Sequence, residues 1–443
     1  MSWRYRPAVD VPISEVELLQ ALIRFDTSSP PGNEKACVEF AGGLLEQAGV
    51  DYRYLALEAA RPNLVARVGG RGDAPPLLVY GHVDVVPADP REWRHPPFGG
   101  DLIDGEVWGR GALDMKGGVA ILLSSLMRVA SSDTAPPGDV ILALTTDEET
   151  GSRTGMKFLV EEHPELLEGV RHAVSEFGGY TLWHGDRRFV PIQVAEKQRC
   201  LIRATVRGPG GHASTLVREP ASEKLGELLS RIATRRLPVH VTAVARLMLE
   251  AMARELPRHE QLLVRSALAP RLAGRLLPFA GSAGRLLTPL LCNTATPTVV
   301  SGGEATNVIP SELSVDLDGR VLPGMSPSDL LAELRVLAGG LATFELVSEE
   351  PAVAIDPDLS LLPLLGGVVT ERDPGCIPIP MLLPGYTDAR FVSKLGIQTY
   401  GFLPMRLPRH LDLALIHAAD ERVPAESIEF GVSCLVDVIG RYR

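Results

Sequence analysis

The chain has 443 residues, of which 45% are hydrophobic and 22% charged, and its formal net charge is −11. That length exceeds what one hydrophobic core usually organises, so we expect two folded units. The acidic balance argues against a surface committed to nucleic acid or anionic membrane, because binding phosphate needs clustered Lys and Arg. The first residues lack the apolar core of a signal peptide and no run approaches a membrane span, so a cytoplasmic protein is expected.

The first half of the chain alternates between helical and strand patterns. The pattern consists of amphipathic stretches near residues 14–25, 34–48 and 117–130 and of strand-like runs at 77–80 and 140–146. Gly49 is a predicted helix stop. This alternation predicts an α/β domain with a mostly parallel sheet and covering helices.

The pattern changes at Lys197 to short alternating strands, CLIRATVRG and ELSVDLDGRV, separated by a helical region. Helix and strand signals return from Asp358. We therefore predict a discontinuous catalytic domain, residues 1–195 and 349–443, interrupted by an inserted α+β domain at 196–348.

Within the insertion, residues 235–290 contain nine Arg and three Glu but neither Lys nor Asp. Two interpretations stay open for this basic region. It is either a set of solvated helices packing on Leu stripes or a basic wall that guides acidic substrates or a partner.

The cysteines are odd in number and widely scattered, so structural disulfides and a cysteine metal site are not expected. We interpret them as small buried hydrophobic residues. They are Cys37, Cys200, Cys292, Cys376 and Cys434.

Polar residues follow two of the predicted strands. YGHVDVVP places His82 and Asp84 at a strand end, where open α/β sheets present their ligands. His82 would bind a metal through one ring nitrogen, while Asp84 accepts a hydrogen bond from the other. TTDEETGS ends the next strand with Glu148 and Glu149, which repel each other unless a cation or proton offsets them. This segment is either a metal site or a surface turn.

Three further residues complete the candidate set. Asp114 lies among glycines in GRGALDMKGG before a predicted helix, where a carboxylate can also act as a cap. Glu176 in VSEFGG and His417 in LIHAADERV are short polar intrusions beside apolar runs. Together these His and acidic residues supply the mixed nitrogen and oxygen ligands that Zn²⁺ accepts.

Seven blocks now stand in a recognisable order: GHVDVVP, GRGALDMKGG, TDEETGS, GPGGHAS, NVIP, DGRVLPG and GYTDAR. In them the sequence resembles the metallopeptidase and amidohydrolase family of glutamate carboxypeptidase, acetylornithine deacetylase, succinyl-diaminopimelate desuccinylase and aminoacylase. The resemblance covers nearly the whole chain. It implies a dizinc aminopeptidase-like α/β catalytic domain with an inserted α+β lid and dimerisation domain, and hence a homodimer.

The resemblance also implies two divalent metal ions, zinc or alternatively cobalt or manganese. The implied ligands are Asp114 as a bridge, His82 and Glu176 in one site, and Glu149 and His417 in the other. A cis peptide bond is implied between Asp114 and Met115.

Catalytic and substrate-binding roles are implied in the same way. Glu148 would be the general base. Asp84, expected to fix the tautomer of His82, is also a catalytic candidate. A histidine matching His212 reaches the substrate carbonyl from the partner subunit in relatives. The residues implied to hold or line the site of the substrate's carboxylate are Asn307, Arg320, Gly385 and Thr387.

The implied reaction is hydrolysis of an amide or peptide bond next to a free carboxylate, in a small amide or short peptide. Two enzyme interpretations stay open: a dipeptidase or carboxypeptidase, and an aminoacylase acting on N-acyl amino acids. A catalytically silent metal-binding scaffold is a third, which the intact Glu148 argues against. Tyr386 stands where a small residue is frequent in the family, and the helical insertion before Asn307 is longer than in compact relatives, so the substrate stays open.

Overall fold

The computed structural model describes residues 13–443 except 280, 353–355 and 412. The chain divides into two compact units. Unit 1 comprises the described residues up to Val194, Pro357–Met381 and Thr387–Arg443, and unit 2 comprises those in Ala195–Asp356 and Leu382–Tyr386. Unit 2 therefore interrupts unit 1 along the chain. No helix within the described ranges is both long and apolar enough to cross a membrane.

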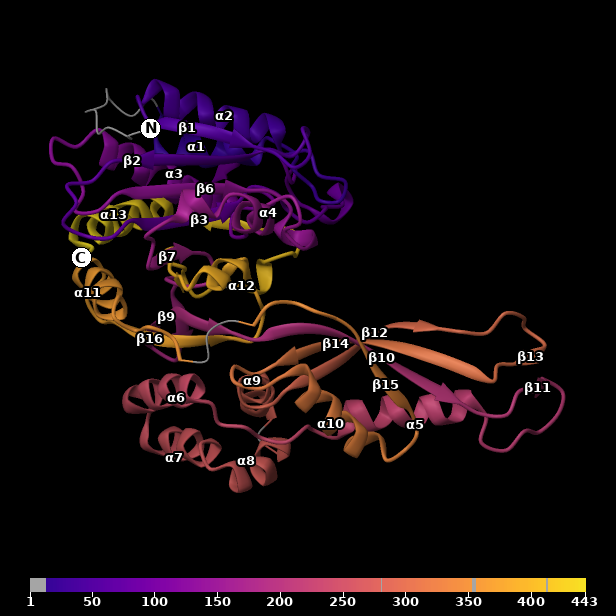
Figure 1. Ribbon diagram of the computed structural model, residues 1–443. Coiled ribbons are helices and arrows are strands. Elements are labelled where there is room, and N and C mark those ends of the chain that lie inside the picture. The colour runs from indigo at the N-terminus through magenta and orange to yellow at the C-terminus, as the bar shows by residue number, and fades with distance from the viewer. Residues whose placement is uncertain (1–12, 280, 353–355, 412) are drawn as a thin grey trace. The chain divides into compact units, whose positions relative to one another are not determined.

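A nine-stranded sheet forms the centre of unit 1 (Figure 1). Its strands are β1 (Asp51–Leu55), β2 (Asn63–Val68), β3 (Leu77–His82), β6 (Val140–Thr145), β7 (His172–Ser175), β8 (Leu182–His184), β9 (Arg187–Glu196), β16 (Cys376–Leu383) and β17 (Gln398–Gly401). The order is β1-β2-β6-β3-β7-β17-β9-β16, with β8 beside β9.

Parallel pairing is confined to the middle of this sheet. The pairs β3/β6, β3/β7 and β7/β17 are parallel, whereas β1/β2, β2/β6 and β9/β17 are antiparallel. The sequence predicted a mostly parallel sheet, and the difference arises because the outer strands reverse direction. The central strands β3 and β6 are buried at every position, which explains their continuous apolar runs.

Helices cover the sheet of unit 1. They are α1 (Glu15–Ile23), α2 (Lys35–Gln47), α3 (Lys116–Ala130), α4 (Met156–Glu162), α11 (Leu362–Arg372), α12 (Ala389–Val392) and α13 (Ala425–Arg441), with short 3₁₀ helices η1 (Pro90–Glu92), η2 (Glu148–Thr150), η3 (Pro164–Leu167), η5 (Ser393–Leu395) and η6 (Leu413–Leu415). α1 and α13 pack beside α3, which lies on β3 and β6. α1 begins with a capping box at Ser14, and Gly49 after α2 has a φ of 66°, as a helix stop requires.

A three-stranded sheet of β4 (Asp101–Ile103), β5 (Glu106–Trp108) and β18 (Arg422–Pro424) also belongs to unit 1. β18 pairs with β5, so the segment that follows His417 is fixed beside the segment that precedes Asp114. Two candidate ligands more than 300 residues apart are thereby tied to one small scaffold.

Unit 2 has its own four-stranded antiparallel sheet in the order β12-β14-β10-β15 and a two-stranded sheet of β11 and β13. The strands are β10 (Gln198–Arg207), β11 (Gly211–His212), β12 (Thr294–Ser301), β13 (Val308–Ile309), β14 (Glu312–Val321) and β15 (Thr343–Glu349). The helices are α5 (Ala221–Thr234), α6 (Ala243–Glu255), α7 (Arg258–Ala267), α8 (Pro270–Leu276), η4 (Leu277–Phe279), α9 (Gly281–Leu291) and α10 (Pro327–Ala338).

One face of the larger sheet in unit 2 is apolar and packs under α5 and α10. Cys200, Ile202, Ala204 and Val206 of β10 are buried in that core, and the residues between them are more exposed. This alternation is the period of two that the sequence showed. The basic region predicted at 235–290 forms α6 to α9.

Candidate metal centre

Four candidate residues lie at the ends of neighbouring parallel strands of unit 1. His82 is the last residue of β3, Glu148 and Glu149 lie just after β6, and Glu176 follows β7 directly. Because β3 pairs in parallel with both β6 and β7, their carboxyl ends meet at one edge of the sheet. Asp114 and His417 reach the same edge from the loop before α3 and the loop after η6.

His82, Asp114 and Glu176 form the first group of possible ligands, and all three are buried. Nε2 of His82 lies 3.2 Å from Oδ1 of Asp114 and 3.4 Å from Oε2 of Glu176. One nitrogen and two carboxylate oxygens thus face a common point.

Asp114, Glu149 and His417 form the second group. Nε2 of His417 lies 3.3 Å from Oδ2 of Asp114 and 3.1 Å from Oε1 of Glu149. The two oxygens of Asp114 therefore face different groups, as a bridging carboxylate requires. Each group offers atoms within 4.8 Å of one another, and these mixed donors fit two divalent cations of the zinc type.

His82 has a defined tautomer because Nδ1 donates to the main-chain carbonyl of Asp84 at 2.9 Å. In the neutral ring, Nε2 would then carry the lone pair that a metal ion binds. The sequence predicted that the Asp84 carboxylate would take this hydrogen bond, but its Oδ1 lies farther away, at 3.5 Å.

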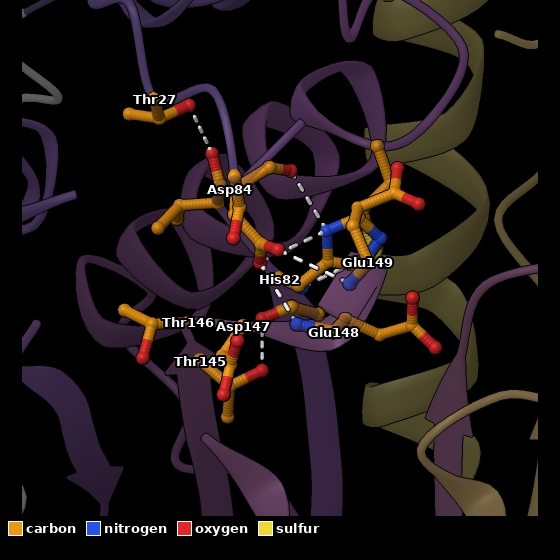
Figure 2. A network of polar contacts seen from close by, with 12 residues as sticks. Thr27, His82, Asp84, Thr145, Thr146, Asp147, Glu148 and Glu149 are labelled. Atoms are coloured by element: carbon orange, nitrogen blue, oxygen red, sulfur yellow. Dashed lines mark hydrogen bonds and ion pairs between the residues drawn. The ribbon is translucent and has the colours of Figure 1, made fainter. Parts of the chain in front are cut away.

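The Asp84 side chain instead holds the turn after β6 (Figure 2). Its two oxygens accept the main-chain N–H groups of Glu148 and Glu149, each at 3.1 Å. Asp147, which precedes them, has a φ of 68°, a backbone conformation that non-glycine residues rarely adopt and that is enriched at functional sites. Asp84 thus links the His82 strand to both adjacent acids.

Burial and crowding shift the pKa values of this site. Burial raises the pKa of Glu176 to about 7 even though His82 opposes the change. Hydrogen bonds that His417 donates to Asp114 and Glu149 raise the pKa of His417 to about 10. Burial would also raise the pKa of Asp114, but hydrogen bonds from His417 and His82 outweigh it and lower that pKa. These side chains attract protons or cations strongly.

Glu148 is not in either ligand group, although its side chain is only 12% exposed. Burial and the neighbouring Glu176 raise its pKa well above the ordinary value. The guanidinium of Arg390 lies 3.7 Å from Oε1 of Glu148 and also donates to the main-chain carbonyl of Thr387. A carboxylate in such surroundings can accept a proton and later release it.

Sequence reasoning missed a buried pair that supports the ligand loops, Arg110 and Glu421. Oε1 of Glu421 accepts the main-chain N–H groups of Leu113 at 2.7 Å and Asp114 at 3.0 Å. Arg110 donates to Glu421 at 2.8 Å and to the main-chain carbonyl of His417 at 3.2 Å. The acid in LIHAADERV was the available signal, because a carboxylate so close to a ligand histidine suggests a supporting role. The expected cis peptide bond between Asp114 and Met115 is present.

The remaining candidates lie mostly in unit 2. His212 is exposed, pairs with Val308 across β11 and β13, and its neighbour Ala213 donates to the carbonyl of Asn307 at 3.0 Å, so the His212 and Asn307 segments are adjacent. Arg320 pairs with Asp318 at 2.5 Å, and its guanidinium lies 4.6 Å from the centre of the Tyr386 ring.

Gly385 and Thr387 fall on either side of the division between the units. Gly385 accepts the main-chain N–H of Lys197 at 3.2 Å within unit 2. Thr387 is buried in unit 1, where its hydroxyl accepts the N–H of Ala389. Thr387 thus binds the first residue of α12, whose N-cap is Asp388.

The chain matches the model of peptidase family M20/M25/M40 over residues 78–441. It is 28% identical to a probable carboxypeptidase S-like protein of Dictyostelium discoideum, over 79% of this chain and 68% of that protein. It is 28% identical to succinyl-diaminopimelate desuccinylase of Paracoccus denitrificans, over 93% and 94% of the two chains. It is 27% identical to the human N-fatty-acyl-amino acid synthase/hydrolase PM20D1, over 82% and 73%.

Solved structures share the fold across both units. The M20 family metallo-carboxypeptidase of Sulfolobus solfataricus superposes with a TM-score of 0.69 at 17% identity, covering 97% of this chain and 99% of that one. The dipeptidase Dug1p of Saccharomyces cerevisiae gives 0.67 at 16% identity, covering 96% and 95%. The predicted α/β class with an inserted domain is confirmed.

Proposed function

The chain belongs to peptidase family M20/M25/M40 and is a metal-dependent hydrolase of amide bonds, and we propose that it cleaves next to a free carboxylate, as a dipeptidase or carboxypeptidase. The proposal rests mainly on the carboxylate of Asp114, because its two oxygens face two different ligand groups. That arrangement suits a dinuclear hydrolytic site. Membership of the family makes the chain an enzyme and leaves the scaffold interpretation without support.

His82, Asp114 and Glu176 would hold one cation, and Asp114, Glu149 and His417 the other. We favour zinc because imidazole and carboxylate ligands in small numbers suit it, with cobalt and manganese as alternatives. When bound, the two cations would supply Lewis-acid chemistry, which makes water acidic at neutral pH and polarises a carbonyl.

Glu148 would act as the general base. Its carboxylate takes the proton of the attacking water and then passes it to the leaving nitrogen, which would otherwise depart as a poor leaving group. The raised pKa of Glu148 supports the second step, because it favours the protonated carboxyl group. Asp84 keeps the Glu148 backbone in place for both steps.

Five residues outside the ligand groups would contact the substrate. Asn307 and Arg320 would hold its carboxylate, since a guanidinium can bind a carboxylate with two parallel hydrogen bonds, and the loop of Gly385 and Thr387 would line the same site. His212 would donate to the carbonyl oxygen as negative charge develops there. In a homodimer formed through unit 2, His212 would come from the partner subunit.

An aminoacylase is the second candidate, and the similarity to a desuccinylase and to an N-fatty-acyl-amino acid hydrolase favours it. A panel of dipeptides and N-acyl amino acids that share one C-terminal residue discriminates the two. Turnover of dipeptides above that of N-acyl analogues supports the peptidase. The reverse order overturns it in favour of the aminoacylase.

We also propose that the enzyme acts in the cytoplasm. Cys37, Cys200, Cys292, Cys376 and Cys434 are all free and buried, which suits a reducing compartment. A thiol count under denaturing conditions, on protein purified without reductant, should find all of them reduced.

A further inference from the structure

A small apolar cavity of about 40 Å³ lies directly beside the candidate metal ligands in unit 1. Asp114 and Glu176 form part of its wall, and most of the remaining wall consists of Leu, Met, Ile and aromatic side chains. Two of the candidate metal ligands therefore line this cavity. No function assigned above uses it.

The cavity wall is held by main-chain contacts. The segment after β7 and the segment after β17 are joined because Leu403 donates to the carbonyl of Gly178 at 2.8 Å and Met405 to that of Gly179 at 3.3 Å. Phe177, between the ligand Glu176 and this wall, has a φ of 59°, which is rare for an aromatic residue. The wall is thus built before any substrate arrives.

The charge of the lining restricts what the cavity accepts. Among the described residues that line it, only Asp114 and Glu176 are charged, and none is cationic. A second carboxylate on the substrate would lose its hydration here without gaining a cationic partner. An uncharged apolar group would instead exchange water for apolar contacts.

The size of the cavity sets a second limit. A cavity of about 150 Å³ is enough to hold benzene, and this one is far smaller. It suits a group with a few carbon atoms, such as an isopropyl group.

We propose that this cavity binds a small, uncharged, apolar group on the acyl side of the scissile bond. The proposal rests on the proposed function, which assigns the carboxylate of the amine side to Asn307 and Arg320 and gives the acyl side no binding residues. The substrate class is then an amide with a short aliphatic acyl group or side chain, and succinyl-type acyl groups are excluded.

The test compares N-isobutyryl, N-succinyl and N-benzoyl derivatives of one amino acid as substrates of the metal-loaded enzyme. We expect kcat/KM for the isobutyryl compound to exceed that of the succinyl compound by at least about 100-fold, because the second carboxylate stays unpaired. Calorimetry on metal-loaded Glu148→Gln protein should show tighter binding of isobutyrate than of succinate. The binding measurement does not depend on turnover.

A cation placed in the wall should weaken the preference for the isobutyryl compound. Leu413 lines the cavity and is half-buried in η6, whereas Leu415 in the same short helix is half-buried and does not line it. Leu413→Lys should raise the succinyl-to-isobutyryl ratio at least about tenfold by supplying a partner for the carboxylate. Leu415→Lys, the matched control, should leave the ratio unchanged.

The outcomes distinguish a failure of the proposed function from a failure of the cavity assignment. Metal-loaded protein that hydrolyses neither these amides nor a dipeptide with the same C-terminal residue contradicts the proposed function. The cavity assignment is overturned if kcat/KM for the succinyl compound equals or exceeds that for the isobutyryl compound. It is also overturned if Leu413→Lys and Leu415→Lys change the succinyl-to-isobutyryl ratio equally. Neither result contradicts the assignment as an amide hydrolase.

Discussion

The buried carboxylate of Glu421 accepts the main-chain N–H of Asp114 at 3.0 Å, across 307 residues of sequence. Through Arg110, the same carboxylate is connected to the main-chain carbonyl of His417. One acid therefore fixes the position of the bridging ligand and, indirectly, that of a ligand in the second group.

Replacing Glu421 with Gln should weaken metal binding by about 10- to 100-fold, since supporting partners of metal ligands have effects of that size. The amide loses one of the acceptor oxygens and leaves the Arg110 guanidinium without its carboxylate. Calorimetric titration of stripped protein with Zn²⁺ measures the change. Glu92→Gln, at an exposed position in η1, is the control. An unchanged Zn²⁺ affinity in Glu421→Gln would show that the Asp114 loop does not depend on Glu421 for its position.

Changing Glu148 to Gln should lower kcat by about 10²- to 10⁴-fold, the usual contribution of a general base, while metal content stays at the wild-type level. Asp114→Ala should lose bound metal as well as activity, because both ligand groups share that residue. Elemental analysis alongside kinetics distinguishes the two results. Wild-type turnover in Glu148→Gln would remove Glu148 from the mechanism.

Arg320→Ala should reduce kcat/KM for substrates with a free carboxylate by about 10- to 100-fold, the size expected for a charged hydrogen bond. Arg320→Lys should not restore it, because an ammonium cannot reproduce the planar two-point contact. The same substrates with an amidated C-terminus are the control. An equal loss on amidated substrates would argue against direct contact with the carboxylate.

Lys197 should make the stability of unit 2 depend on pH. Burial lowers its pKa to about 7, and its ammonium donates to the carbonyls of Pro289 and Cys292. Between pH 7 and its unfolded pKa of about 10.4, the unfolded chain binds one more proton, so stability rises with pH by up to about 1.4 kcal/mol per unit. This contribution is lost as pH falls to 7.

Denaturant unfolding at pH 7 and pH 9 checks this expectation. From pH 7 to pH 9, the free energy of unfolding of the wild type should rise by roughly 2 kcal/mol more than that of Lys197→Met. Lys35→Met, at an exposed lysine, should show no such change. The same difference between wild type and Lys197→Met at both pH values would mean that Lys197 titrates normally.

Mixing His212→Ala with Glu148→Gln protein tests the shared site. In a symmetric dimer, each mixed pair would contain one site with both residues intact, so random mixing should recover about a quarter of wild-type activity. Either variant alone should be nearly inactive. Verified mixed dimers without recovery would show that His212 does not act across the interface.

Much of the fold follows from local patterns, as the helices near Glu15 and Lys35 and the strand ending at His82 illustrate. The antiparallel margins of the sheet did not follow, because strand direction depends on connections that apolar runs do not encode. The site shows the same division. Residues in short blocks were predictable. The partners of Glu421 were not, because they are main-chain N–H groups, and only its place near His417 in the sequence gave a signal.

The role of Asp84 shows why side-chain partners are hard to predict. Its place two residues after His82 suggested a hydrogen bond to the imidazole. The structure gives that hydrogen bond to the Asp84 carbonyl and directs the carboxylate to Glu148 and Glu149, 64 and 65 residues away. The partner of the Asp84 carboxylate depends on the pairing of β3 with β6, which the spacing of residues in the sequence does not reveal.

The most direct test of the account is turnover of a carboxylate-bearing amide by chelator-stripped protein before and after Zn²⁺, Co²⁺ or Mn²⁺ is returned, with bound metal counted. A dinuclear metal site predicts no turnover in stripped protein and full recovery of turnover as two metal ions bind each chain. Amide hydrolysis that persists after both ions are removed would contradict it.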